Sequence, residues 1–111
     1  MTLRRRRLGQ AGEQAARRFL ESKGWEWRGS NLQTSYGEID LLFTEGETLV
    51  AVEVKTRTMS SYEVVTQKQL ARIGRALEFV AQANHHTGPL RVDLVTVTPS
   101  GIQHIRNVSA Q

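Results

Sequence analysis

The sequence contains no cysteine, which excludes disulfide bonds, thiolate metal ligands and a secreted disulfide framework. No apolar run approaches the roughly 20 residues that a helix needs to cross a bilayer. The N-terminus is charged but lacks the apolar segment that follows the charged start of a signal peptide. We therefore expect a cytoplasmic protein that does not enter a membrane.

The chain has 111 residues and a hydrophobic content of 39% that is concentrated in periodic segments. These features predict one folded domain over residues 1–111. The net charge is +4, and the basic run consists of Arg4, Arg5, Arg6 and Arg7. Residues 1–8 could form a solvated, flexible arm, or the four arginines could contact the phosphates of a nucleic acid.

The stretch from Gly37 to Arg57 predicts a β-hairpin, because two runs rich in β-formers flank a short turn that contains glycine. A two-residue turn at Gly46 and Glu47 would place Asp40 opposite Glu53. Strict alternation divides the first strand between two faces. One face would carry Glu38, Asp40 and Leu42, and the opposite face Ile39, Leu41 and Phe43.

Opposed carboxylates at Asp40 and Glu53 would have Cβ atoms about 4.5–5.5 Å apart and would repel each other. A divalent cation removes this conflict, since hard cations prefer carboxylate oxygens. Lys55 lies two residues after Glu53 and shares its face. An exposed acid–lysine pair is the structural alternative. The functional interpretation is metal-assisted phosphodiester hydrolysis, in which Asp40 and Glu53 hold Mg²⁺ or Mn²⁺ and Lys55 orients water or stabilises developing charge.

Two amphipathic helices are expected. One runs from about Gly9 to Lys23 and carries Glu13 near the edge of its packed face, where it could be a first-turn acid favoured by the helix dipole. The other begins after Thr66, whose capping-box pattern is completed by Gln69, and ends at His86. Its second face carries Lys68, Arg72 and Arg75. This basic stripe could be a solvated face or could follow a phosphate backbone.

Further strands are expected over Trp25–Asn31, Arg91–Thr98 and Ile102–Val108. The second helix is long enough to be a crossover that returns Arg91–Thr98 parallel to Leu49–Thr56. The element order predicts an α/β domain with a mixed sheet and flanking helices.

Several short motifs resemble the YraN-like family of bacterial proteins along nearly the whole chain. They are Gly9-x-x-Gly12-Glu13, Asn31, Gly37-Glu38-Ile39-Asp40-Leu41, Val52-Glu53-Val54-Lys55-Thr56-Arg57, Val65-Thr66-x-Lys68-Gln69 and Val92-Asp93. The resemblance implies a PD-(D/E)XK nuclease related to archaeal Holliday-junction resolvases, with a restriction-endonuclease-like αβββαβ core. It also implies that Asp40, Glu53 and Lys55 are the nuclease signature and that Glu13 is directed toward the metal. The segment after Arg57 is shorter than the family's usual glycine-containing loop.

Two functions follow as hypotheses. The first is a Mg²⁺- or Mn²⁺-dependent endonuclease, selective for structured DNA rather than RNA and, by analogy with resolvases, acting as a homodimer. The second is a protein that binds nucleic acid without cleaving it, within a repair or processing complex. In both, the expected nucleic-acid contacts are Arg57, the Lys68–Arg72–Arg75 stripe and the basic run at residues 4–7.

Overall fold

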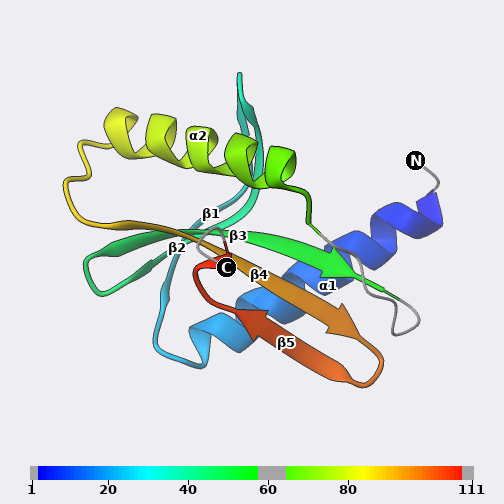
Figure 1. The fold of residues 1–111 in the computed structure, drawn as a ribbon. Helices are drawn as coiled ribbons and strands as arrows, with labels where there is room; N and C mark the ends of the chain where they lie inside the picture. Colours follow the sequence, from blue (N-terminus) through cyan, green and yellow to red (C-terminus); the bar gives the residue numbers. More distant parts are fainter. Residues whose placement is uncertain (1–2, 58–64, 109–111) are drawn as a thin grey trace.

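The computed structural model describes residues 3–57 and 65–108, with side chains from residue 9 onward. Two helices and five strands follow one another in the chain (Figure 1). They are α1 (Leu3–Glu21), β1 (Glu26–Thr34), β2 (Gly37–Glu45), β3 (Thr48–Thr56), α2 (Gln67–Ala83), β4 (Leu90–Thr98) and β5 (Gly101–Ile105). Neither helix is long and apolar enough, within these described residues, to cross a membrane.

The five strands form one mixed sheet in the order β1-β2-β3-β4-β5. β3 and β4 are parallel, and the other neighbouring pairs are antiparallel. The crossover through α2 produces the parallel pair, because a strand can return in the same direction only after a connection of this length. The predicted α/β class, the mixed sheet and its flanking helices are therefore confirmed.

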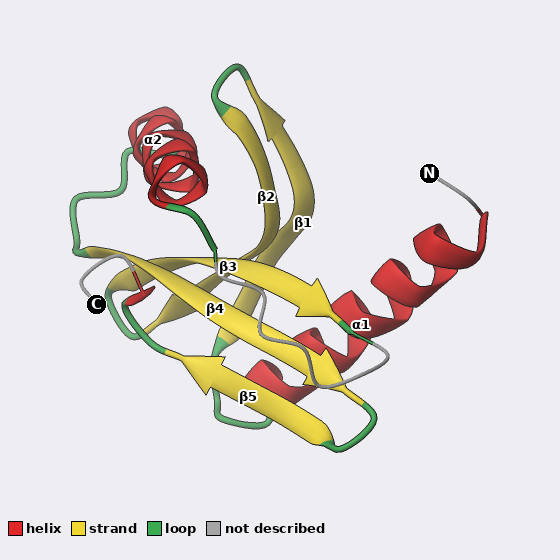
Figure 2. Ribbon diagram, turned by 45° about the vertical axis from the view of Figure 1, so that its right-hand side comes forward, coloured by secondary structure: helices red, strands yellow, loops and turns green. Residues whose placement is uncertain are grey.

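The two helices cover opposite faces of the sheet (Figure 2). On β3, Leu49 and Ala51 pack in a core beneath α2. Val50 and Val52 pack in a second core against α1. This alternation follows from the two-residue period of a strand, and it explains why β3 is apolar on both faces over its first half.

α2 begins as the sequence predicts. The Thr66 hydroxyl accepts a hydrogen bond from the Gln69 amide nitrogen, and the Gln69 side chain accepts one from the Thr66 amide nitrogen. The helix ends at Ala83 rather than His86, with Asn84 as its C-cap and His85 at a φ of 55°. A left-handed residue cannot continue an α-helix, so the last predicted turn is absent.

Other element boundaries also differ from the expected ones. α1 begins at Leu3 rather than near Gly9, so the basic run lies in its first turns and not in an arm before it. Arginine and leucine favour helix, and neither glycine nor proline interrupts residues 3–8. β1 continues to Thr34, because the Thr34 hydroxyl accepts hydrogen bonds from the Tyr36 and Gly37 amides and closes a tight turn. β5 covers Gly101–Ile105 instead of Ile102–Val108.

Among the side chains that the structure describes, Asp93 on β4 is the only charged one that is buried, and its exposed fraction is 0%. Arg91 donates to both of its carboxylate oxygens, at 2.8 and 3.0 Å. Nε2 of His104 lies 2.8 Å from one oxygen, and the Asn107 amide donates to the other at 2.9 Å. The hydrogen bond to Asn107 belongs to a turn in which Asn107 has a φ of 53°, so the last strand ends before it.

Candidate active site between β2 and β3

The candidate site lies where β2 and β3 separate. Their pairs run from Glu45–Thr48 to Leu41–Val52, which confirms the predicted register and its two-residue turn. Beyond the last pair, the Asp40 carboxylate accepts a hydrogen bond from the Val54 amide at 2.9 Å. Figure 2 shows the far ends of β1 and β2 rising away from the β3–β5 part of the sheet. At this fork, where β2 and β3 separate, the Asp40 side chain thus takes the place of backbone hydrogen bonds between the two strands.

The expected alternation along β2 is wrong. Ile39 and Leu42 both pack in the core beneath α2, whereas Leu41 and Phe43 pack against α1. An odd-numbered and an even-numbered residue can share a face only if the strand twists out of its regular period between them. Asp40 lies at this irregularity, which turns its carboxylate across the gap toward β3.

The fork brings Asp40 and Glu53 together. Burial raises the pKa of Glu53, and hydrogen bonding with Asp40 and repulsion from its charge raise it further, to about 8. The positive charge of Lys55 opposes this shift. The Glu53 side chain is only 18% exposed, so solvent does little to relieve the repulsion.

Lys55 extends from the same strand. Its Nζ lies 3.9 Å from the Glu53 Oε1 atom, and its side chain is 20% exposed. This separation permits electrostatic attraction but is too long for a hydrogen bond. The ammonium group can therefore donate to another oxygen atom while it stays beside the two carboxyl groups.

Glu13 approaches the site from α1. Asn31 on β1 donates its side-chain amide to both Glu13 oxygens, at 3.2 and 3.3 Å. Burial raises the pKa of Glu13, the Asn31 hydrogen bond opposes this, and the charges of Asp40 and Glu38 raise it further. The charge of Asp40 therefore acts on Glu13, although Glu13 is hydrogen-bonded to Asn31.

Two residues position Glu13 without having been assigned a role from the sequence. Asn31 has a φ of 52°, a left-handed conformation that asparagine tolerates better than most residues. Gly12 packs so closely on Thr56, at the end of β3, that a Cβ atom there would collide with the threonine hydroxyl. In the sequence, Asn31 is an asparagine within a strand and Gly12 is a glycine inside a helix. Either could indicate a special role, but neither pattern identifies the residue that it contacts.

The carboxyl groups of Asp40, Glu53 and Glu13 have the oxygen donors that Mg²⁺ or Mn²⁺ prefers. The charge of Asp40 helps to raise the pKa of Glu53, and a cation between the two carboxyl groups would remove this repulsion. Across residues 3–57 and 65–108, however, no three Asp, Glu or His side chains are grouped so that they could hold a metal ion. The donor chemistry fits such a cation through the Asp40–Glu53 pair, and Glu13 stands apart from it, bound to Asn31.

The expected nucleic-acid contacts occupy different places. Lys68, Arg72 and Arg75 are exposed along α2. Arg57 is partly buried after β3, where its amide bonds Val97 and its Nη1 atom donates to the Thr56 carbonyl oxygen at 2.7 Å. The side chains of residues 4–7 and the short segment 58–64 lie outside the described residues.

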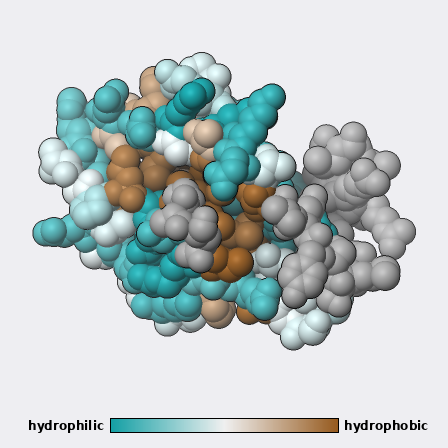
Figure 3. Space-filling view, viewed as in Figure 1, coloured by the Kyte–Doolittle hydropathy of each residue, from teal (hydrophilic) through white to brown (hydrophobic). Residues whose placement is uncertain are grey.

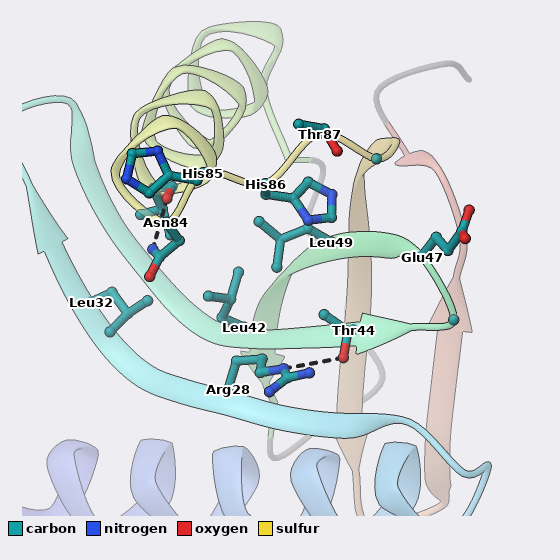
Figure 4. A pocket seen from close by; sticks show the side chains of 13 residues that line it. Arg28, Leu32, Leu42, Thr44, Glu47, Leu49, Asn84, His85, His86 and Thr87 are labelled. Carbon is teal, nitrogen blue, oxygen red and sulfur yellow. Dashed lines mark hydrogen bonds between the residues drawn. The ribbon is translucent and has the colours of Figure 1, made fainter.

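A pocket of about 910 Å³ lies elsewhere, between the C-terminal end of α2 and the β2–β3 turn (Figure 4). Arg28, Leu42 and Thr44 contribute from the strands, and His85 and His86 from the segment after α2. None of the predicted site residues lines this pocket. The candidate site between β2 and β3 is therefore separate from this pocket.

Three related proteins place the chain among known sequences. A UPF0102 protein of Beutenbergia cavernae is 40% identical over an alignment of 111 residues. The alignment covers 91% of this chain and 94% of that protein. One from Symbiobacterium thermophilum is 43% identical over 101 residues, covering 85% and 84% of the two chains. One from Thermotoga maritima is 36% identical over 98 residues, covering 86% and 91%. Residues 12–97, from Gly12 beside Glu13 to the next-to-last residue of β4, match the Uncharacterised protein family UPF0102. The chain therefore belongs to this family, which confirms the YraN-like resemblance.

Proposed function

We propose that this protein is a divalent-metal-dependent endonuclease of the PD-(D/E)XK type that hydrolyses phosphodiester bonds in branched or otherwise structured DNA. The observation that carries the proposal is the partly buried Asp40–Glu53 carboxyl pair with Lys55 beside it. A fold gains no stability from a carboxyl group whose pKa is raised to about 8 by burial and by a neighbouring acid. Such an arrangement is typical of functional sites whose ligand restores the balance of charge.

The architecture supports the same proposal. One helix, three antiparallel strands, a crossover helix and a parallel strand follow one another as expected for a restriction-endonuclease-like αβββαβ core. The acids lie where the central hairpin separates, so a phosphate could reach them from solvent. By analogy with resolvases, a two-fold dimer would present two such sites to a four-way junction.

Each residue has a role that its contacts allow. Asp40, held by the Val54 amide, and Glu53 would hold Mg²⁺ or Mn²⁺, with Glu13 contributing after release from Asn31. When bound, the cation withdraws charge from a phosphate oxygen and makes water a better nucleophile. Lys55 would donate a hydrogen bond to that phosphate or orient the attacking water, since its Nζ is not engaged by a short bond to Glu53.

A cleavage assay tests the proposal. Purified protein is incubated with four-way junctions, flaps, single strands and duplexes of DNA in Mg²⁺ or Mn²⁺. Asp40→Asn and Lys55→Ala should each reduce the rate by at least about 100-fold, as is common when a charged group that stabilises the transition state is removed. Glu47→Gln is the matched control, because Glu47 is an exposed acid in the turn of the same hairpin. Absence of cleavage on every substrate, or equal rates for Lys55→Ala and the parent, would reject the nuclease.

A non-catalytic nucleic-acid-binding protein is the second candidate. Its specific support is the exposed Lys68–Arg72–Arg75 stripe, together with the lack of a ready group of three metal-binding side chains in the described residues. Calorimetric titration with Mn²⁺ separates the two candidates. Binding that disappears in Asp40→Asn supports the nuclease, whereas salt-sensitive DNA binding without any Mn²⁺ binding supports the second candidate.

A further inference from the structure

Two exposed aromatic rings meet at the edge of α2. Tyr36, in the turn between β1 and β2, is 46% exposed, and Phe79 on α2 is 49% exposed. Their ring centroids are 6.4 Å apart, and the ring planes are tilted by 58°. Figure 2 shows the tip of the β1–β2 hairpin rising beside the helix. Single exposed hydrophobic residues are ordinary, but this pair joins two elements that are distant in the sequence.

Phe79 continues the basic stripe of α2. Lys68, Arg72, Arg75 and Phe79 are spaced by four, three and four residues, so their side chains project from one face of the helix. Arg72 also lies next to the hairpin tip, because a Cβ atom built on Gly37 would contact the Arg72 Cβ at 4.0 Å. Figure 3 shows mostly hydrophilic residues over α2 at the top of that view. The aromatic pair therefore adjoins a run of positive charge.

Charge decides which ligand fits this surface. The stripe has three cations, and α2 has one acid, Glu78, which lies three residues after Arg75 at the side of the stripe. A neutral or basic protein partner would gain nothing from such a row of cations. A polyanion whose apolar groups can also contact the rings matches both features, and a strand with unpaired bases is such a polyanion.

We propose that Tyr36 and Phe79 form a platform on which an unpaired base stacks while the adjoining phosphates contact Arg72 and Arg75. This inference rests on the nucleic-acid substrate of the proposed function but not on cleavage. Tyr36 precedes Asp40 by four residues on the same hairpin arm, roughly 13 Å along an extended strand. A single-stranded segment held there would enter the fork from one side, so the preferred substrate would carry a flap, gap or overhang.

Equilibrium binding in EDTA tests the platform separately from cleavage. Fluorescence anisotropy is measured with labelled oligothymidylate and with a blunt duplex. The double variant Tyr36→Ala/Phe79→Ala should bind the single strand about 10- to 100-fold more weakly, because stacking contributes strongly for each base. Its duplex affinity should change by less than about threefold, since paired bases are not available to stack. Tyr36→Phe should retain the parent affinity.

Trp27→Ala is the matched control. Trp27 is also an exposed aromatic residue, at 39%, but its ring lies 3.7 Å from the Arg17 guanidinium and belongs to the α1 side of the molecule. This variant should bind the single strand normally. Circular dichroism verifies that each variant is folded, which is expected because both platform residues are exposed.

Several results would overturn the platform. These are unchanged single-strand binding by the double variant, an equal loss of duplex binding, or equal affinity for an oligonucleotide whose bases have been removed. Self-association that disappears in the double variant, measured by sedimentation, would instead assign the surface to a second copy of the chain. Stacking without cleavage in Mg²⁺ would reject the nuclease and keep the platform. Cleavage by the parent protein, together with normal single-strand binding by the double variant, would keep the nuclease and reject the platform.

Discussion

Replacing Asp93 by asparagine should strongly destabilise the fold, although Asp93 lies outside the candidate site. Its fully buried carboxylate accepts two hydrogen bonds from Arg91 and one from the Asn107 amide, and it pairs with His104. Removing one partner of a buried ion pair costs about 3–5 kcal/mol, because the remaining charge stays buried without compensation. Glu45 lies 2.7 Å from Arg91 and keeps part of that compensation. The expected loss is therefore about 3 kcal/mol.

Urea denaturation measures this loss. With a slope of about 1.5–3 kcal/mol per molar, the midpoint should fall by roughly 1–2 M. Glu45→Gln is the control, because Glu45 belongs to the same network but its side chain is 32% exposed. It should cost less than about 1 kcal/mol, as exposed ion pairs do. A loss below about 1 kcal/mol for Asp93→Asn, or equal losses for the two variants, would refute the reasoning from burial.

Three further predictions concern pH and packing. Burial alone would raise the pKa of Asp93, but its hydrogen bonds hold the pKa below 3.8. The stability that Asp93 provides is therefore lost as the pH falls below about 3.8. In acid denaturation, Asp93→Asn should lack this loss. In EDTA, folded Glu53 stays protonated up to a pKa of about 8 whereas the unfolded chain releases the proton near 4.5. Thermal denaturation should therefore show that stability falls by a few kcal/mol as the pH rises from 4.5 to about 8, with a slope of at most ~1.4 kcal/mol per pH unit. The variant Glu53→Gln should lack this fall. Equal pH profiles for the variant and the parent would contradict the carboxyl pair. Gly12→Ala should cost about 1–3 kcal/mol in urea denaturation through its clash with Thr56, whereas Gly9→Ala, with open space around it, should be neutral or stabilising.

Much of the candidate site could be predicted from the sequence because it depends on a tight turn. Once Gly46 and Glu47 form a two-residue turn, the register between the strands is determined, and Asp40 and Glu53 come together at its end. The direction of the Asp40 side chain could not be predicted in this way. Regular alternation assigns it a face of the sheet, but the strands separate there and the carboxylate bonds the Val54 amide instead.

The features that arise between near neighbours in the chain could be predicted from the amino-acid sequence. The Thr66 capping box, the hairpin turn and the apolar periodicities of α2 and β3 each need only a few consecutive residues, and they specified the element order and the mixed sheet. Which distant residues meet depends instead on the packing of the folded chain. The contacts of Asn31 with Glu13, Gly12 with Thr56, Arg91 and His104 with Asp93, and Tyr36 with Phe79 join separate elements. Such contacts depend on how closely helices and strands approach in three dimensions, and no local pattern encodes that distance.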